Sequence, residues 1–465
     1  MMENYQVLVI GAGPGGYVAA IRAAQLGLKT AIVERAELGG VCLNWGCLPT
    51  KTLLRSTEIL RLAREGTSYG LVLDSAPRFD LTTAVKRSRD VAKQLNRGVQ
   101  GLMKKNKVTV LTGHARLLGK GKVAVDNAGA EQKVQAKHII LATGARARSI
   151  PGFEPNSESI WTAREAMVPE VLPKSITVIG AGAIGVEFAS FYATAGSKVT
   201  ILEASDHILP VEDSEISDML AGYLRKQGTE IYAGVHVESQ QSTTYGVNVN
   251  FTQGEKALSV ESEKVILAVG ITGNVEGLGL ENTKIQVDRT HIIVNEHCET
   301  EEPNIYAIGD VAGPPWLAHK ASHEGVMVAE LIAGIEDVHI LDPKSVPSCT
   351  YCYPQVASVG ITEEQALEQG LEVNIGRFPF IGNGKALSLG ESDGMVKTII
   401  DKNTGELLGA HMIGPEVTEM ISTYALARTL ETTEVELMRT VFPHPTLSEA
   451  LHESVLAAYG RALHI

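Results

Sequence analysis

Cys42 and Cys47 are the residues whose types and spacing most directly indicate chemistry in this chain. They lie within residues 39–51, and the segment between them ends in Gly46. If this segment makes one distorted turn, the two thiols can meet and close a small disulfide ring. Strained or exposed disulfides tend to be labile and catalytic, whereas two buried thiols would be ordinary core residues. The pair alone leaves both interpretations open, and its surroundings must decide between them.

A glycine-rich turn that follows an apolar strand occurs twice, at residues 11–16 and at residues 180–185. Each turn is followed by an alanine-rich helical stretch and by a second apolar strand that ends in an acid, Glu34 or Glu203. The interval from the first glycine to the acid is 23 residues in both copies. One such turn is a weak signal. Two in the same strand–turn–helix–strand context strongly predict two dinucleotide-binding units.

Each glycine of these turns has its own physical task. The first allows the tight turn, the second lets the backbone approach a pyrophosphate, and the third permits close packing of helix on strand. The following helix presents unpaired N–H groups and its positive dipole end to the phosphates. Glu34 and Glu203 are expected to accept hydrogen bonds from ribose hydroxyls. The six glycines are Gly11, Gly13 and Gly16 in the first copy and Gly180, Gly182 and Gly185 in the second.

The two units predict two different cofactors. Because the cysteine pair directly follows the first unit, we expect FAD there and a nicotinamide nucleotide in the second. Glu203 would repel a ribose 2′-phosphate, and residues 204–207 after it contain no arginine. NAD is therefore favoured over NADP. The same context favours the redox interpretation of the cysteine pair.

The bulk properties exclude several classes of protein. The net charge of −13 argues against nucleic acid or an anionic membrane as the main partner. No apolar run reaches the ~18 residues that a membrane-spanning helix needs, and we expect no signal peptide because the first strand begins almost at once. Five cysteines in 465 residues do not make a disulfide scaffold, which predicts a reducing, cytoplasmic location. No metal site is predicted.

The length suggests about three domains. The order of strands and helices predicts an α/β fold with two Rossmann-like, three-layer dinucleotide-binding domains, for FAD and for NAD, and a C-terminal α+β domain. We expect the FAD-binding domain at residues 1–149, completed by 273–344, and the NAD-binding domain at 150–272. The last domain is expected at 345–465, with its final helix over 447–462.

His444 lies between two prolines just before that final helix, and Glu449 follows within the same segment. The prolines hold the histidine in an extended local backbone. Glu449 could orient the imidazole and leave one ring nitrogen available as a base. The alternative is an ordinary structural or solvated histidine, since acids near histidines are common.

Taken together, these features resemble the FAD-dependent pyridine nucleotide-disulfide oxidoreductase family along essentially the entire chain. The most specific motifs are residues 39–51, 317–320 and 444–449. The resemblance implies that Cys42 is the thiol that exchanges with substrate and that Cys47 is the charge-transfer thiol against the flavin. It also implies that the C-terminal domain forms a homodimer.

The resemblance assigns further roles. Lys51 would lie near the flavin and pair with Glu187, and His444, with Glu449, would act as the base in the partner subunit's site. Additional contacts to FAD are implied for Gly113, Ala115, Thr143, Gly144, Asp310 and Ala318, and additional contacts to NAD for Val237 and Gly270.

The implied activity is oxidation of protein-bound dihydrolipoamide to lipoamide through the disulfide and FAD, with reduction of NAD⁺ to NADH. The implied partners are the lipoyl domains of a 2-oxoacid dehydrogenase acyltransferase or the glycine cleavage H protein. A glutathione reductase should show arginines after the second turn, and a mercuric reductase should end in a cysteine pair. This chain has neither. A flavin-binding scaffold without activity is the remaining alternative.

Four features depart from the family pattern, and one of them is Pro354-Gln355 in place of a Pro-Glu pair typical of the interface domain. Phe442 occupies a position where the family usually has a second histidine, and residues 270–274 replace a common Gly-Arg-x-Pro-Asn run. Cys349 and Cys352 form a CxxC motif outside the catalytic pattern. We expect these two cysteines to be structural residues of a strand, with a second redox site or a metal site as the alternative.

Overall fold

The structure is a computed structural model and describes residues 3–465. The chain forms two compact units. The first contains the chain up to Leu53 together with Thr82–Arg148 and Gly270–Pro343, and the second contains Leu54–Leu81, Ser149–Val269 and Lys344–Ile465. Among the described residues, no helix combines the length and apolar character that crossing a lipid bilayer requires.

A mixed seven-stranded sheet forms the centre of the first unit, in the order β3-β2-β1-β6-β5-β4, with β19 paired to β6. The run 7–10 in its central strand is apolar and buried on both faces, as a parallel strand covered on both sides requires. The strands are β1 (Glu3–Ile10), β2 (Thr30–Glu34), β3 (Thr109–Thr112), β4 (His114–Gly119), β5 (Lys122–Asn127), β6 (Ala130–Leu141) and β19 (Ile305–Ala307).

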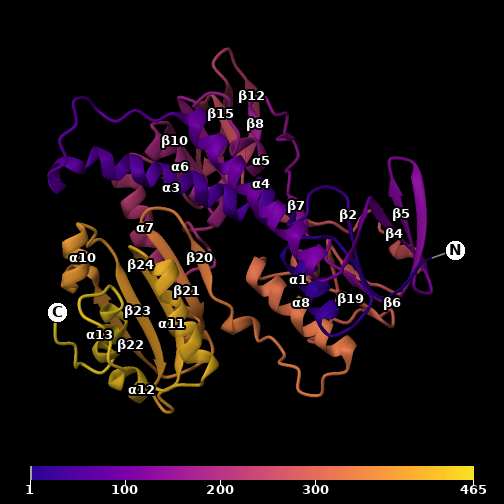
Figure 1. Cartoon of the computed structure of the whole chain (residues 1–465). Coiled ribbons are helices and arrows are strands. Elements are labelled where there is room, and N and C mark those ends of the chain that lie inside the picture. The colour runs from indigo at the N-terminus through magenta and orange to yellow at the C-terminus, as the bar shows by residue number, and fades with distance from the viewer. Residues whose placement is uncertain (1–2) are drawn as a thin grey trace. The chain divides into compact units, whose positions relative to one another are not determined.

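Two helices of this unit, α1 (Pro14–Gln25) and α8 (Ala318–Ala333), lie side by side although about three hundred residues separate them (Figure 1). Their close approach depends on glycine, because a Cβ at Gly325 would lie 2.5 Å from the carbonyl oxygen of Gly15. The unit also contains α2 (Gly40–Trp45), the start of α3 (Cys47–Arg64), α4 (Leu81–Lys105), η2 (Leu280–Asn282), η3 (Gly309–Ala312), and the strands β7 (Ala145–Ala147), β16 (Ile271–Gly273), β17 (Val287–Asp288) and β18 (His291–Ile292).

The second unit repeats the βαβ arrangement in a five-stranded parallel sheet with the order β11-β10-β9-β15-β8. An antiparallel meander, β12-β13-β14, shares a core cluster with this sheet. The elements are β8 (Ile160–Trp161), α5 (Ala163–Ala166), β9 (Ser175–Ile179), α6 (Ala183–Ala195), β10 (Lys198–Leu202), α7 (Ser214–Lys226), β11 (Glu230–Tyr232), β12 (Val235–Ser242), β13 (Val247–Gln253), β14 (Lys256–Ser262) and β15 (Lys264–Leu267).

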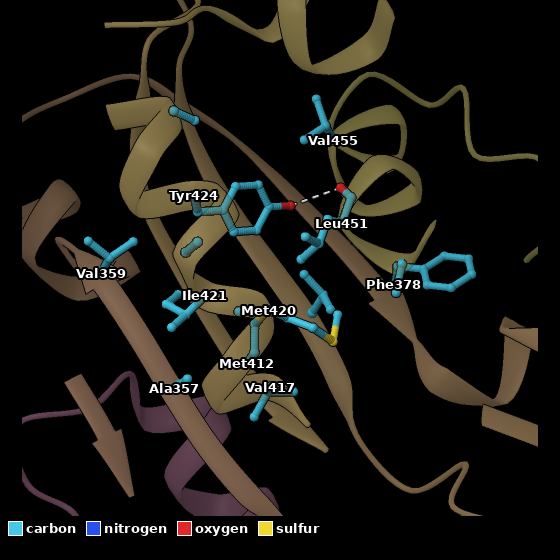
Figure 2. Packing of buried hydrophobic residues seen from close by; sticks show 14 of the residues in the cluster. Ala357, Val359, Phe378, Met412, Val417, Met420, Ile421, Tyr424, Leu451 and Val455 are labelled. Carbon is cyan, nitrogen blue, oxygen red and sulfur yellow. Dashed lines mark hydrogen bonds between the residues drawn. The ribbon is translucent and has the colours of Figure 1, made fainter. Parts of the chain in front are cut away.

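The C-terminal part of the second unit is an antiparallel sheet with the order β20-β21-β24-β23-β22. Figure 2 shows its core, in which the Tyr424 hydroxyl donates a hydrogen bond of 2.8 Å to the Leu451 carbonyl and so links two helices. The elements are β20 (Ser348–Thr350), β21 (Gln355–Gly360), α9 (Glu363–Glu368), β22 (Val373–Pro379), α10 (Gly384–Leu389), β23 (Met395–Asp401), β24 (Leu407–Gly414), α11 (Val417–Thr429), α12 (Glu434–Arg439) and α13 (Glu449–Ala457).

The final helix is shorter than the predicted span of 447–462, because α13 ends at Ala457. Gly460 has a φ of 65°, and the N–H of Arg461 donates back to the Leu456 carbonyl. A glycine in the left-handed conformation, followed by an N–H that donates back to a carbonyl of the last helical turn, is a common helix C-cap. The α/β class with two dinucleotide-binding sheets and a C-terminal α+β part is confirmed.

Candidate active site

The cysteine pair lies at the junction of two helices. Helix α2 ends at Trp45, Gly46 leaves the helical conformation, and α3 begins at Cys47. The cysteines are thiols in this structure, and the Cys42 side chain hydrogen-bonds to Cys47. This bond, together with burial, strongly raises the pKa of the Cys42 thiol, while the positive charge of Lys51 opposes the shift. The structure therefore brings Cys42 and Cys47 together within reach of the positive charge of Lys51. The predicted place of Lys51 near the flavin stays a prediction.

Side chains that the sequence analysis did not single out brace this junction. The amide of Asn44 is buried and donates to the carbonyls of Leu38 and Gly40 at 2.9 Å. The guanidinium of Arg89 donates to the Asn44 carbonyl at 2.6 Å and lies 3.9 Å from the centre of the Trp45 ring. Arg89 belongs to α4, for which the sequence analysis predicted no role. No pattern in the sequence around Arg89 indicated that it would bind residues 39–51, which we call the redox segment.

The first glycine turn has the geometry that a pyrophosphate site needs. Gly11 has a φ of 101°, and a Cβ there would lie 2.2 Å from the Ala142 carbonyl oxygen. A Cβ at Gly16 would lie 1.9 Å from the Gly11 carbonyl oxygen, so only glycine allows this approach of helix to strand. A Cβ at Gly13 would meet nothing within 4 Å. Space for a ligand is therefore open at the start of α1, whose N-terminus has no side-chain cap.

Glu34 is tied to this turn through its carboxylate. One oxygen accepts from the N–H of Ala12 and the other from the N–H of Ala36, both at 2.8 Å. The N–H of Gly113 donates to the Glu34 carbonyl at 2.9 Å. Each carboxylate oxygen retains a second lone pair that could accept from a ribose hydroxyl. Ala115, by contrast, has its side chain in the hydrophobic core, so only its backbone could face a cofactor.

Asp310 lies in η3, directly after β19, and Ala318 is the first residue of α8. Burial raises the pKa of Asp310 most strongly, with Glu324 adding to the rise and Lys320 opposing it. Lys320 and Glu324 form a buried ion pair of 2.8 Å. Glu324 also accepts from the N–H of Gly309 at 2.7 Å and so fixes η3 to α8. The sequence analysis singled out residues 317–320 as a family motif, but it did not predict the contacts of Glu324 with Lys320 and Gly309.

Thr143 and Gly144 form the turn beside Gly11. The hydroxyl of Thr143 donates to the Asn274 carbonyl at 2.9 Å, and the Asn274 amide returns a bond of 2.9 Å to the Thr143 carbonyl. Gly144 has a φ of 65°. Although residues 270–274 depart from the family pattern, their strand β16 pairs antiparallel with β7.

The second glycine turn reproduces the first. Gly180 has a φ of 97°, a Cβ at Gly185 would lie 2.0 Å from the Gly180 carbonyl oxygen, and a Cβ at Gly182 would meet nothing within 4 Å. Glu203 accepts from the N–H of Ala181 at 2.5 Å and from Ser205 at 2.8 Å. Helix α6 also has no side-chain cap at its N-terminus. The turn is thus shaped for a second dinucleotide.

Three further predicted site residues have different surroundings. Glu187, on α6, is 4% exposed and accepts from the N–H of Tyr351 at 2.9 Å. Val237 is half-buried against the core cluster of the second unit. Gly270 has a φ of 100° and falls at the first residue of a segment of the first unit. The predicted pairing of Glu187 with Lys51 involves residues of different units and stays a prediction.

His444 and Glu449 form a dyad. The His444 Nδ1 lies 2.9 Å from the Glu449 Oε1, and the second carboxylate oxygen accepts from the N–H of Thr446 at 2.8 Å. Burial opposes ionisation, but the hydrogen bonds from Thr446 and His444 prevail and lower the pKa of Glu449. Because the carboxylate accepts at Nδ1, the neutral ring keeps Nε2 as a base. His444 is 79% exposed in the single chain, while Phe442 packs against the core beside it.

The thiols of Cys349 and Cys352 hydrogen-bond to main-chain carbonyl groups. The Cys349 thiol lies 3.8 Å from the Thr418 carbonyl oxygen, and the buried Cys352 thiol lies 3.1 Å from that of Pro354. Among residues 3–465, no group of three or more histidine, cysteine or acidic side chains could hold a metal ion. These contacts support the structural interpretation of the CxxC motif.

Comparison with known proteins gives the family. Residues 5–325 match the pyridine nucleotide-disulphide oxidoreductases, and residues 346–455 match the dimerisation domain of that family, which supports a homodimer. The chain is 51% identical to the dihydrolipoyl dehydrogenase of Rhizobium etli over 480 residues and 52% identical to that of Zymomonas mobilis over 466 residues, with full coverage of both proteins in each pair.

Solved structures agree with this result. The crystal structure of LpdA from Mycobacterium tuberculosis matches with a TM-score of 0.90 at 25% identity, covering 98% of this chain and 99% of that one. The HOCl-induced flavoprotein disulfide reductase RclA from Escherichia coli matches with a TM-score of 0.86 at 29% identity, covering 97% and 99%. The resemblance inferred from the sequence motifs is confirmed: the chain belongs to the pyridine nucleotide-disulphide oxidoreductase family.

Proposed function

We propose that the chain is a dihydrolipoyl dehydrogenase, which oxidises dihydrolipoamide to lipoamide and reduces NAD⁺ to NADH. The observation that carries this proposal is the contact of Cys42 with Cys47 near the charge of Lys51. These residues lie in and directly after α2, in the first unit, which also contains the first glycine turn. The second turn, with Glu203 at its ribose position, supports NAD as the electron acceptor. Relatives of this name share 42–52% identity with the chain over nearly its full length.

FAD and NAD fit the two turns on the structure's own geometry. At Gly13 and at Gly182 the space that a side chain would fill is open, and each lies at an uncapped helix N-terminus. FAD would be held by the first turn, Glu34, Asp310 and the start of α8, and NAD by the second turn and Glu203. When bound, FAD supplies the two-electron transfer that links the dithiol to NAD⁺.

The chain's own residues supply the thiol exchange. In the oxidised enzyme Cys42 and Cys47 form a disulfide, and Nε2 of His444 takes a proton from one substrate thiol. The resulting thiolate attacks Cys42 and releases Cys47 as a thiolate, because thiolates are the nucleophiles in this exchange. The second substrate sulfur then expels Cys42, and the substrate leaves as a disulfide. Two electrons thereby pass from the substrate to the cysteine pair.

The raised pKa of Cys42 fits its part in this sequence, because the expelled Cys42 sulfur takes up the proton of the second substrate thiol, while Cys47 carries the charge. Lys51, whose charge acts on the pair, would stabilise that thiolate. Glu449 holds His444 in the tautomer that leaves Nε2 available. The exposure of the dyad in the single chain supports its use in the partner subunit's site of a homodimer.

The finer assignments belong to the same proposal. We assign residues 1–149 with 273–344 to FAD, residues 150–272 to NAD and residues 345–465 to dimerisation. Substrate would arrive on lipoyl domains of an acyltransferase or of the glycine cleavage H protein. The small number of cysteines fits a cytoplasmic enzyme.

The test is an assay of the purified protein with two pairs of substrates, dihydrolipoamide with NAD⁺ and glutathione disulfide with NADPH. We expect the first reaction alone, together with a long-wavelength thiolate–flavin band after mild two-electron reduction. His444→Gln should lower turnover by ~10²-fold, since it removes the proton acceptor. A colourless protein, or activity with glutathione disulfide alone, would contradict the proposal.

A further inference from the structure

Three basic residues form a row across adjacent strands of the C-terminal sheet. In the register of β22, β23 and β24, Arg377 lies opposite Lys397, and Lys397 lies opposite His411. Lys397 is 1% exposed and His411 is 2% exposed. Like charges placed directly opposite one another destabilise a sheet. This row, which we call the basic row, therefore needs acidic partners from another element.

Those partners come largely from residues 212–215, at the N-terminus of α7 in the dinucleotide-binding part of the same unit. The ammonium group of Lys397 lies 2.8 Å from Asp213 and 3.0 Å from Glu215. Asp213 is fully buried and caps α7 by accepting from the N–H of Glu215. Burial lowers the pKa of Lys397, but the hydrogen bonds that its ammonium group donates to Asp213, Glu363 and Glu215 outweigh burial and raise it. The lysine is thus held as a cation.

At one end of the basic row Arg377 repeats this ion pairing, and at the other end His411 faces a buried acid without a hydrogen bond to it. Arg377 pairs with Glu215 at 2.8 Å and with Glu363 at 2.7 Å. The Nδ1 of His411 lies 3.8 Å from the buried Oε2 of Glu212, while its Nε2 lies 2.9 Å from the Ile361 carbonyl oxygen. Each of the three basic residues therefore faces an acid of residues 212–215.

Glu212 and Asp213 end the loop that follows Glu203, and this loop returns to the second glycine turn. The N–H of Leu209 donates to the Ala181 carbonyl at 2.8 Å, and the N–H of Glu212 donates to the Leu209 carbonyl at 2.9 Å. On its other side, Ala181 donates its N–H to Glu203. Ala181, in the turn that would face the pyrophosphate, is therefore hydrogen-bonded to Glu203 and to Leu209. The loop that contains Leu209 ends at Asp213, which pairs with Lys397.

We propose that Lys397 is a positioning residue for NAD, which holds the 204–213 loop so that Ala181 and its flanking glycines keep the shape that receives the dinucleotide. The proposal rests on the proposed function in taking this turn as the NAD site. The buried ion pair also implies that removing one partner leaves the other charge without compensation. The effect should fall on NAD binding, because the dithiol belongs to the other unit.

The test uses the FAD-loaded enzyme with Lys397→Met. The matched control is Lys402→Met in the turn directly after β23, whose exposed pair with Glu372 lies outside the basic row. We expect Lys397→Met to raise the Kd of NADH and the KM of NAD⁺ by about ten-fold. Reduction of the enzyme by dihydrolipoamide without NAD⁺ should stay within about two-fold of wild type, as should every parameter of Lys402→Met.

If Lys397→Met does not fold, Asp213→Asn provides the second measurement, because asparagine keeps the helix cap and loses the charge. It should raise the Kd of NADH by about three-fold. An unchanged Kd in a folded variant, or an equal loss in both half-reactions, would overturn the proposal. A wild-type enzyme that binds NADH and does not oxidise dihydrolipoamide would contradict the proposed function and leave the test of Lys397 intact.

Discussion

The two glycine turns are built alike and lead to different structures. In each, the N–H of the central alanine, Ala12 or Ala181, donates to the acid 23 residues beyond the first glycine. The carbonyl of the same alanine accepts a bond of 2.8 Å from the loop after the second strand, at Gly39 or at Leu209. The first loop enters α2 and the cysteine pair directly. The second runs to Asp213 and the basic row.

This comparison shows that the same glycine turn can have a different role in each domain, because a different segment follows its second strand. Beside the first turn, a Cβ at Gly40 would lie 2.6 Å from the Cα of Gly13, so the redox segment lies against the phosphate turn itself. Beside the second turn, Leu209, which makes the hydrogen bond that Gly39 makes beside the first, has a φ of 47°. The first attachment brings chemistry to the cofactor, whereas the second anchors the site to another sheet.

The largest effect should come from Cys47→Ser, which removes the chemistry attached to the first turn. We expect turnover of dihydrolipoamide with NAD⁺ to fall by ~10³-fold or more, because serine cannot complete the exchange. The Kd of NADH should stay within about two-fold, since the second turn is unchanged. Steady-state assays and NADH titration measure the two quantities. Turnover within about ten-fold of wild type would refute the assignment of the dithiol.

Gly16→Ala and Gly185→Ala test whether the turns bind different cofactors. The added Cβ would lie 1.9 Å from the Gly11 carbonyl oxygen in one variant and 2.0 Å from that of Gly180 in the other. With the same steric conflict in both, we expect Gly16→Ala to lose FAD and Gly185→Ala to keep it while the Kd of NADH rises by ~10–100-fold. Flavin absorbance and NADH titration separate these outcomes. Loss of FAD in both variants would show that the assignment is wrong.

A smaller effect is expected from Glu34→Gln and Glu203→Gln, because glutamine keeps one acceptor and loses the charge. Glu203 is 7% exposed and Glu34 is half-buried, so the change at Glu203 should matter more. We expect the preference of the Glu203→Gln variant for NAD⁺ over NADP⁺ to decrease by about ten-fold, because repulsion of the 2′-phosphate weakens. The ratio of kcat/KM values for the two nucleotides measures this. An unchanged ratio would exclude Glu203 as the selecting residue.

The smallest effect concerns glycines outside the turns. Gly98 in α4 and Gly222 in α7 lie in helices, and a Cβ at either would meet nothing within 4 Å. Alanine at each position should stabilise the fold by roughly 0.5–1 kcal/mol, because it reduces the entropy of the unfolded chain. Thermal unfolding measures this. Destabilisation at either site would show that local space does not explain which glycines the fold requires.

The sequence by itself determined the two glycine turns, the acids 23 residues beyond them and the cysteine pair, because each is a local pattern whose chemistry follows from spacing. It also indicated the dyad of His444 and Glu449, which are close along the chain. It missed the end of α13, although Gly460 was a readable stop signal.

Only the tertiary structure decided which distant side chains support these sites. The amphipathic pattern of α4 could not show that Arg89 would lie over Trp45. The register of three strands places Arg377, Lys397 and His411 in one row, and a one-residue shift would turn these side chains to the other face. Most of their acidic partners come from residues 212–215, more than 150 residues earlier in the chain. Such pairings arise from packing, and no local pattern of residues specifies them.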